Sequence, residues 1–549
     1  MPSSVREILD RRRVPLLGIA IGASLLGAWH NRFVQDDAFI SFRYARHLVD
    51  GHGLVFNVGE RVEGYTNFLW TLLVAGGLRL GIDPVPFTIG AGLIACAATL
   101  ALTAVAAGNL CGRGSPVPLA AVLLLGANYS FSAYATGGLE TQLQTALFAG
   151  AAALLFRFLD DPRAGPAAGL SIVLAMALLT RPDSALVAAV FGITALITVA
   201  RRPTGRGAVL AALVVPGALI VGPWLLFKLS YYGSVLPNTF RAKVSSATSL
   251  TWGLSYVGAF AVRYWLPPAL LAAALALPRL LRIAPLKAAA LVATLALWLL
   301  YVVRVGGDFM EFRMLVPVLP FLFVLLPWSC TVFARGRAAA AALVLLTVAG
   351  SAAHAWRGGT HVDVFGRQQF IESVPALAAH LVQPGENWSG VGRALGRRFP
   401  ATTGVTLSAT ACGAIPFYSD LPTIDMFGLN DAWVAREGVA IGFRPGHQRY
   451  APVEYLLRRR VNLLIGHPTV RPAAAPIVNP ARDVDWNRFL LVDRIDALPP
   501  GASLVEIPVD ERSTLVALYL VRHAAVDAAI AAEGWRVHSL AGLAERGRR

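Results

Sequence analysis

Long apolar segments recur along the first two thirds of this chain, and they constrain its fold more than any other feature. A membrane-spanning helix needs roughly 17–25 mainly apolar residues, and shorter helices suffice where they tilt or pack inside a bundle. The candidate spans are 14–29, 87–109, 117–136, 139–159, 167–180, 184–200, 207–229, 265–278, 288–304, 314–333 and 339–353. Hydrophobic residues make up 56% of the 549 residues and charged residues only 15%, which excludes an ordinary soluble enzyme. We therefore predict a mainly α-helical polytopic membrane protein with about 11 membrane spans and additional juxtamembrane helices.

The basic residues predict how the chain is oriented. The net charge is +16, and arginines gather in short loops between apolar segments, at 201–206, 279–287 and 335–337. Cytoplasmic loops carry such an excess, so we place these loops inside the cell and infer no nucleic-acid partner. Arginines at 11–13 precede the first apolar segment without a small-x-small cleavage site, which predicts an uncleaved first helix and a cytoplasmic N-terminus. Successive spans can cross in alternating directions, with all of these basic loops inside, only if 67–80 is a juxtamembrane or re-entrant helix and not a span.

From about residue 354 the composition changes. The apolar runs shorten to strand length, and Pro, Gly and charged residues lie between them. These runs are 404–410, 461–466, 503–508 and 516–521. We predict a transmembrane domain over 1–353, whose first outer loop is 30–86, and a soluble α/β domain over 354–549 on the outer face of the membrane.

Motifs for water-soluble nucleotides and for metals are absent from the sequence. It has no P-loop, no Rossmann glycine fingerprint and no HExxH, and its four cysteines are scattered without a CxxC pair. A transferase that uses nucleotide sugars would normally carry a cytoplasmic α/β domain. The charged motifs of this chain fall instead on the predicted outer face, where lipid-linked sugars are the available donors.

Two adjacent carboxylates, Asp36 and Asp37, follow the first apolar segment. One interpretation is structural, because acidic residues at the start of "DDAFISFRYARHLV" favour the helix dipole and cap the helix. The other is a general base at the membrane surface, with a divalent cation left open, because adjacent carboxylates repel and one pKa rises. Arg43 and Arg46 lie about two turns further along, so cations and carboxylates can border one cleft.

Other polar residues gather at the predicted outer ends of the apolar segments. Their types suit sugar and phosphate sites, and charges beside hydrocarbon usually mark a functional site. They are Glu60, Glu63, Tyr65 and Asn67 in "GHGLVFNVGERVEGYTN", Glu140 in "YATGGLETQ", Asp183 in "TRPDS", Asn238, Arg241 and Lys243 in "YYGSVLPNTFRAK", and Arg304, Asp308, Glu311 and Arg313 in "RVGGDFMEFRMLVP". Arginine and lysine at membrane depth suit a lipid phosphate. The alternatives are an ordinary loop, helix caps and cations that snorkel to the surface.

These motifs together resemble the bacterial GT-C membrane glycosyltransferases. The Asp-Asp pair, "RYARHL", "GHGLVFNVGERVEGYTN", "TGGLE", "LTRPD", "YYGSVLPNTFRAK", "VGGDFM" and "FGLND" carry the resemblance. They resemble in particular the group of terminal β-(1→2)-arabinofuranosyltransferases, although "GYTN" departs from its pattern. The resemblance covers almost all of the membrane part and a portion of the outer domain.

The resemblance implies an inverting transferase that takes a sugar from a polyprenyl-phosphate donor in the bilayer. Asp36 or Asp37 would deprotonate the acceptor hydroxyl, a step typically worth about 10²–10⁴-fold. The residues that would stabilise the phosphate are Arg43, Lys243 and Arg313, and those that would shape the sugar pocket are Glu63, Glu140 and Asp183. Arabinofuranose is one candidate sugar, other envelope sugars stay open, and no cofactor is implied with certainty.

The outer domain is a candidate site for an envelope glycan acceptor. Asp425, Asn430 and Asp431 in "IPFYSDLPTIDMFGLND" and the stretch "RPGHQRY" at 444–450 are the residues that we assign to it. The alternative, of equal weight, is that these loops pack the outer domain onto the membrane part.

Two other classes of protein compete with an enzyme of the bacterial plasma membrane. One is a non-catalytic GT-C-like factor that assembles an envelope or motility structure, and such a factor would tolerate the loss of both aspartates. The other is a flippase of lipid-linked glycans, which would carry charges at mid-membrane and paired broken helices. The gathering of charges at one face argues against a flippase.

Overall fold

A computed structural model describes the chain over most of its length. The described residues are 3–112, 114–243, 250–333, 336–356, 361–364, 367–441, 448–475, 477–490, 492 and 498–540, and the side chains of 3–13, 243, 337, 361–364, 367–370, 488 and 489 are left out of the description.

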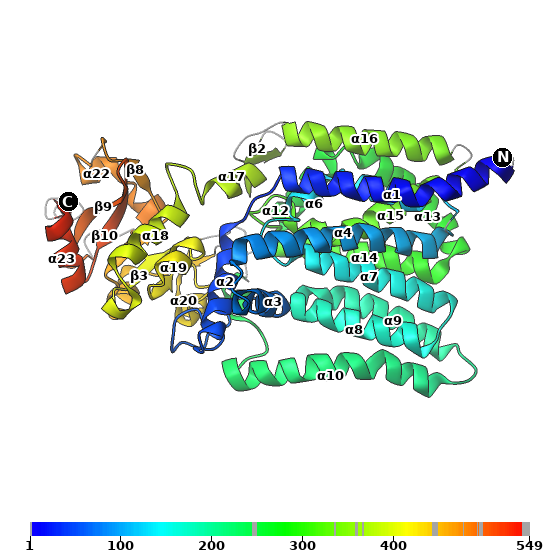
Figure 1. The fold of residues 1–549 in the computed structure, drawn as a ribbon, viewed down its shortest axis with the longest axis horizontal. Coiled ribbons are helices and arrows are strands. Elements are labelled where there is room, and N and C mark those ends of the chain that lie inside the picture. Colours follow the sequence, from blue (N-terminus) through cyan, green and yellow to red (C-terminus); the bar gives the residue numbers. More distant parts are fainter. Residues whose placement is uncertain are drawn as a thin grey trace.

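Most apolar segments form helices that lie side by side in one bundle (Figure 1). The bundle helices are α1 (Ser3–His30), α4 (Pro84–Cys111), α5 (Val117–Gly126), α6 (Tyr129–Ala133), α7 (Thr141–Asp160), α8 (Ala164–Thr180), α9 (Ala185–Ala200), α10 (Arg206–Tyr232), α12 (Leu250–Arg263), α13 (Pro267–Ile283), α14 (Pro285–Val305), α15 (Leu319–Cys330) and α16 (Gly336–Trp356). Each predicted span therefore contains helix. The predicted span 117–136 differs, because the chain breaks after α5 and the Asn128 side chain caps α6 by accepting a hydrogen bond from the Phe131 N–H.

Within the described residues, seven helices are long and apolar enough to cross a membrane, and the count reaches eight if a bent pair forms one span. That pair is α12 and α13, whose axes differ by 100°. Shorter apolar helices include Val14–His30, Val117–Gly126 and Ala164–Thr180, which coincide with predicted spans. The chain is thus a multi-pass membrane protein, and the number of 11 crossings stays a prediction.

The bundle has two chemically different ends. At one end Lys287 donates to the Asn109 carbonyl at 2.8 Å and pairs with Asp160 at 2.7 Å, and Arg279 donates to the Val332 carbonyl at 3.2 Å. The N-terminus lies at this end (Figure 1). The C-terminal domain covers the opposite end, which we call the domain end.

Short elements build the domain end. They are α2 (Asp36–Val49), α3 (Phe68–Arg79), α11 (Asn238–Lys243), and the 3₁₀ turns η1 (Pro182–Ser184) and η2 (Arg313–Val318). The short helix predicted at 67–80 is confirmed by α3. Helix α2 runs across the bundle axis, between the bundle and the C-terminal domain (Figure 1).

The C-terminal domain is built on one mixed sheet, in agreement with the predicted α/β class. Its strand order is β11-β9-β10-β7-β3-β4, and β8 also pairs with β10. The strands are β3 (Leu407–Ala409), β4 (Thr423–Asp425), β7 (Leu463–Gly466), β8 (Val470–Pro472), β9 (Ser503–Asp510), β10 (Ser513–Tyr519) and β11 (Arg536–Ser539). Strand β3 runs parallel to β4 and β7, whereas β7, β8, β9 and β11 meet their neighbours β10 or β9 in antiparallel pairs.

Helices and two small hairpins complete this domain. The helical elements are α17 (Val374–Ala379), α18 (Trp388–Arg398), η3 (Ala401–Thr403), α19 (Ala414–Ser419), α20 (Ala432–Glu437), α21 (Val453–Arg458), α22 (Pro480–Asp483), the π-turn η4 (Trp486–Leu490) and α23 (Ala524–Glu533). The hairpins pair β1 (His361–Val364) with β2 (Arg367–Glu372), and β5 (Val439–Ala440) with β6 (Arg449–Tyr450). Of these elements, α19 begins beside Asp36 of α2, and the end of β2 contacts Phe309.

Candidate active site at the domain end

The loop of the "TGGLE" motif supports the start of α2. The Gln35 N–H donates to the Gly137 carbonyl at 3.1 Å, and the Gln35 side chain caps the helix at the Asp37 N–H. Gly138 has φ +77°, and a Cβ there would lie 2.8 Å from the Cβ of Ala38. The motif therefore needs glycine, because the loop turns sharply against the helix that carries the paired aspartates.

One face of α2 is turned to the C-terminal domain. Residues spaced by three or four lie on one side of a helix, which groups Asp36 with Arg43 and His47. Asp36 is buried, and its carboxylate accepts hydrogen bonds from the Gly413 N–H at 3.1 Å and the Ala414 N–H at 2.8 Å. Burial raises the pKa of Asp36 to about 7, against the lowering effect of these two bonds.

Arg43 belongs to the same face and is also committed to the domain contact. Its Nε donates to the Phe56 carbonyl at 2.7 Å, its Nη2 to the Leu421 carbonyl at 3.0 Å, and its Nη1 to the Pro416 carbonyl. Burial lowers the pKa of Arg43 to about 10, so the side chain stays charged at neutral pH. The structure does not place Arg43 beside Arg181 and Arg313, the two arginines that line the pocket described below.

The adjacent face of α2 carries Asp37 and Ser41, and Ser41 is turned toward Asn67 of the first outer loop. The Ser41 hydroxyl donates to Asn67 Oδ1 at 3.0 Å, and Asn67 Nδ2 donates to Glu140 Oε2 at 2.7 Å. Asp37 is half-buried and lies one turn before Ser41 on this face. This face therefore leads from Asp37 into a cluster of charges at the top of the bundle.

Arg181 is the centre of that cluster. Its Nη1 lies 2.6 Å from Glu140 Oε1, and its Nη2 lies 2.8 Å from Asp183 Oδ2. Gln144 also donates to Asp183, at 2.7 Å. Burial acts to raise the pKa of Glu140, but the Arg181 guanidinium holds that pKa below its usual value. Two carboxylates thus fix the orientation of one guanidinium at the junction of α7, α8 and α9.

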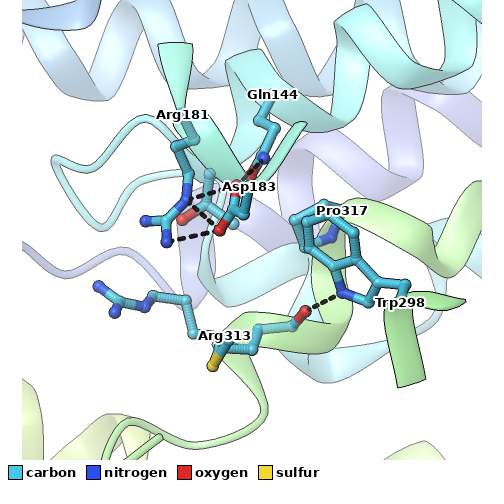
Figure 2. A pocket seen from close by; sticks show the side chains of 8 residues that line it. Gln144, Arg181, Asp183, Trp298, Arg313 and Pro317 are labelled. Carbon is cyan, nitrogen blue, oxygen red and sulfur yellow. Dashed lines mark hydrogen bonds and ion pairs between the residues drawn. The ribbon is translucent and has the colours of Figure 1, made fainter. Parts of the chain in front are cut away.

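Arg313 reaches the same place from the start of η2. Its Nε and Nη2 donate to Asp308 at 2.9 and 2.7 Å. Arg313 and Arg181 line the same small pocket, and Figure 2 shows both guanidinium groups on one side of it with Trp298 on the other. The lining residues are Thr141, Gln144, Arg181, Asp183, Trp298, Arg313, Met314 and Pro317. Two oriented guanidiniums beside a pocket suit a phosphate group.

Three residues predicted from the first outer loop lie away from this pocket. Glu60 pairs with Arg459 of the C-terminal domain. Glu63 pairs with Lys228 of α10 at 3.1 Å, and both side chains are buried. The Tyr65 hydroxyl lies 3.2 Å from the Tyr232 hydroxyl. Asn67 alone among the predicted loop residues joins the Arg181 cluster, through its bond to Glu140.

Asn238 stabilises the contact between the domains, whereas the side chains of Asp425 and Asp431 bond within the C-terminal domain. Asn238 donates to the Gly428 carbonyl at 2.8 Å. Asp425 accepts from the N–H and the side-chain amide of Asn430, both at 2.9 Å, and Asp431 caps α20. The bonds from Asn238 to the carbonyls at 428–431 fit the alternative of loop packing that the sequence left open.

Two further predictions fall outside the described part of the structure. The side chain of Lys243 is one of those left out of the description, and most of the stretch 444–450 lies in the undescribed residues 442–447.

Sequence reasoning missed Arg181 and Lys228. Arg181 stands in the "TRPDS" motif beside Asp183, and a guanidinium between apolar segments was a usable signal. Lys228 lies inside the predicted span 207–229, where a cation is costly unless it is paired. Both residues are paired with carboxylates in the structure.

Metal ligands do not gather in the part of the chain that the structure describes. No group of three or more His, Cys, Asp and Glu side chains there has the arrangement to hold a metal ion. The carboxylates of the cluster instead face guanidinium groups.

Comparison with solved structures defines the class of fold. The chain is similar to ArnT from Cupriavidus metallidurans bound to undecaprenyl phosphate, with a TM-score of 0.54 and 14% identity over 92% of this chain and 97% of that chain. It is also similar to the Archaeoglobus fulgidus oligosaccharyltransferase in the apo form, with a TM-score of 0.51 and 10% identity over 84% and 69% of the two chains. The chain therefore has the GT-C fold, as the sequence predicted.

Curated relatives narrow the comparison. The chain is 32% identical over 387 residues to the terminal β-(1→2)-arabinofuranosyltransferase of Corynebacterium glutamicum, covering 61% of this chain and 54% of that protein. It is 29% identical over 325 residues to the protein of the same name from Mycobacterium tuberculosis, covering 53% and 51%. The chain thus spans about half the length of the relatives that it matches. A family described as a domain of unknown function, DUF8728, matches residues 377–519 of the C-terminal domain.

Proposed function

We propose that this protein is an inverting glycosyltransferase that moves a sugar from a polyprenyl-phosphate donor to an envelope glycan on the outer face of the bacterial plasma membrane. The relatives' name supports arabinofuranose as the first sugar to test. The undecaprenyl phosphate in the ArnT structure supports a polyprenyl-phosphate carrier. Because the likeness covers about half of each relative, sugar and acceptor are part of the proposal.

The observation that carries this proposal is the division of α2 into two faces. Asp36 is bonded to the C-terminal domain through two backbone N–H groups. Asp37 lies on the face that carries Ser41, from which hydrogen bonds lead through Asn67 and Glu140 to Arg181. We therefore assign the general base to Asp37, which would take the proton of the acceptor hydroxyl as the hydroxyl oxygen attacks the anomeric carbon.

The phosphate would bind between Arg181 and Arg313. As the bond from the anomeric carbon to the phosphate oxygen breaks, negative charge grows on the leaving phosphate. Two guanidiniums already oriented by Glu140, Asp183 and Asp308 can stabilise that charge without rearranging. The carboxylate partners thus hold the cations in place rather than contact the sugar.

The assignment of sides follows from the two ends of the bundle. The basic loops and the N-terminus lie at one end, and the polar cluster lies at the other. By the positive-inside rule the domain end faces outward. A lipid-linked donor would then enter from the bilayer, and a glycan acceptor from the outside.

A transfer assay with the purified full-length protein in nanodiscs tests this proposal. The donors are polyprenyl-phosphate arabinofuranose and a panel of other polyprenyl-phosphate sugars, and the acceptor is an arabinofuranosyl oligosaccharide. We expect transfer from one lipid-linked donor and none from nucleotide sugars, which serve as the control. Absence of transfer from every donor would contradict the proposal and favour a non-catalytic assembly factor.

A further inference from the structure

We propose that the C-terminal domain sets the position of Asp37 by gripping α2 through α19, so that Asp36 and Arg43 act as positioning residues. This inference rests on the proposed function, because it concerns the geometry of that same site. It assigns a catalytic consequence to a domain contact that lies outside the pocket.

Polar side chains of α2 bind backbone groups along 413–421, the stretch that contains α19. Asp36 meets the start, where it accepts from the N–H groups of Gly413 and Ala414. Arg43 donates to the Pro416 carbonyl, which also accepts from the Asp420 N–H, and to the Leu421 carbonyl, two residues past α19.

Arg46 adds to the grip at the end of α19. Its Nη1 donates to the Phe417 carbonyl at 2.8 Å, and its guanidinium lies 3.7 Å from the centre of the Phe417 ring. Phe39 packs on the same ring with a centroid distance of 5.4 Å. Hydrogen bonds to the backbone, a cation–π contact and aromatic packing thus hold the same short helix.

Gly413 brings the two backbones into direct contact. A Cβ at this position would lie 1.9 Å from the Asp36 carbonyl oxygen and 2.6 Å from the Asp36 Cγ. Any side chain there would push α19 away from the first turn of α2, where Asp37 also lies. The backbones of α2 and of the residues before α19 therefore leave no room for a side chain at position 413.

The same domain also reaches the segment that carries Arg313. The Glu372 N–H at the end of β2 donates to the Phe309 carbonyl at 2.7 Å, and the Val374 N–H donates to Glu311 Oε2 at 2.8 Å. The domain therefore contacts both halves of the site, α2 and the segment before Arg313. Its docking fixes the separation between the proposed base and one of the phosphate-binding cations.

Gly413→Ala in the full-length protein in nanodiscs tests the inference, with Gly501→Ala as the matched control. Gly501 lies in the same domain, and a Cβ there would meet nothing within 4 Å. The measurements are hydrogen exchange of the amides of α2, and kcat and KM for the polyprenyl-phosphate donor. We expect Gly413→Ala to accelerate exchange in α2 and to lower kcat by about 10²-fold, because small displacements of a base are costly. KM should change by less than about threefold, and Gly501→Ala should match the wild type.

Wild-type exchange in α2 together with wild-type kcat would overturn the inference, as would faster exchange spread evenly over the whole bundle. If Gly413→Ala does not fold, Asp36→Asn takes its place, because it keeps the shape of the side chain and loses one acceptor. It should accelerate exchange in α2 and α19 only. The exchange experiment needs no substrate. It therefore still tests whether the C-terminal domain holds α2 if no donor is turned over and the proposed function fails.

Discussion

The two faces of α2 place adjacent carboxylates in opposite situations. Asp36 is buried against α19 and receives two backbone hydrogen bonds. Asp37, one residue later, is half-buried on the side of Ser41 and the Arg181 cluster. Because successive helix positions differ by about 100°, one residue is enough to separate a docking contact from a candidate catalytic group.

The arginines divide in the same way. Arg43 donates to carbonyl oxygens of the first loop and the C-terminal domain, whereas Arg313 is oriented by the carboxylate of Asp308 beside the pocket. A cation that meets only backbone carbonyls stabilises a fold. A cation held at one edge by a carboxylate can present its other edge to a phosphate.

The largest effect is expected at the buried pair of Glu63 and Lys228. Lys228→Met removes one partner and leaves Glu63 buried, which should lower the free energy of unfolding by about 3–5 kcal/mol. Turnover per folded molecule should change little, because the pair lies away from the pocket. Thermal unfolding and activity of the same sample measure both. The double variant Glu63→Gln/Lys228→Met should regain most of the stability. If this double variant is as stable as the wild type but loses turnover, Glu63 takes part in the active site.

The arginines provide the next test. Arg313→Lys keeps the charge but loses the planar donor group, and we expect kcat/KM to fall by roughly 10²–10³-fold. Arg43→Lys should lower stability more than turnover per folded molecule. Steady-state kinetics on protein purified by size-exclusion chromatography compare the two variants. Equal losses of kcat/KM in the two variants would contradict the distinction between Arg43 as a docking residue and Arg313 as a phosphate-binding residue.

The smallest effect is a pH dependence of stability. The pKa of Asp36 is raised from 3.8 to about 7 in the folded protein, so the folded state binds more protons than the unfolded state between these values. Stability from this group is therefore present below about pH 4 and is lost as pH rises through about 7. Asp36→Asn should flatten the change in Tm between pH 4 and pH 7, measured by tryptophan fluorescence. An unchanged slope would show that other groups cause it.

The sequence predicted what depends on local pattern. Apolar length marked the helices, and short apolar runs marked the strands β3, β7, β9 and β10. That α3 does not cross the membrane stays a prediction. The polar motifs were predicted to share one end, and Asn67, Glu140, Asp183 and Arg313 do meet there. These features follow from periodicity and from the cost of charges beside hydrocarbon.

The sequence could not predict what depends on distant partners. Asp36 and Gly413 are separated by 377 positions, and nothing near Asp36 indicates that two N–H groups of the C-terminal domain would bind it. Arg43 likewise pairs with backbone carbonyls, which any residue supplies, so its partners leave no mark in the sequence. The break after α5 is capped by Asn128 and bonded by the distant Ser351 hydroxyl, and apolar length reveals neither contact.

The central claim is that Asp37 is the base and Asp36 is a docking residue. The most direct measurement is the rate of sugar transfer by Asp37→Asn and Asp36→Asn, side by side in nanodiscs at saturating donor, with binding of polyprenyl phosphate measured on the same samples. We predict that Asp37→Asn loses about 10²–10⁴-fold in kcat and still binds polyprenyl phosphate, whereas Asp36→Asn loses about tenfold. The reverse order of the two losses, or wild-type turnover by Asp37→Asn, would contradict the account.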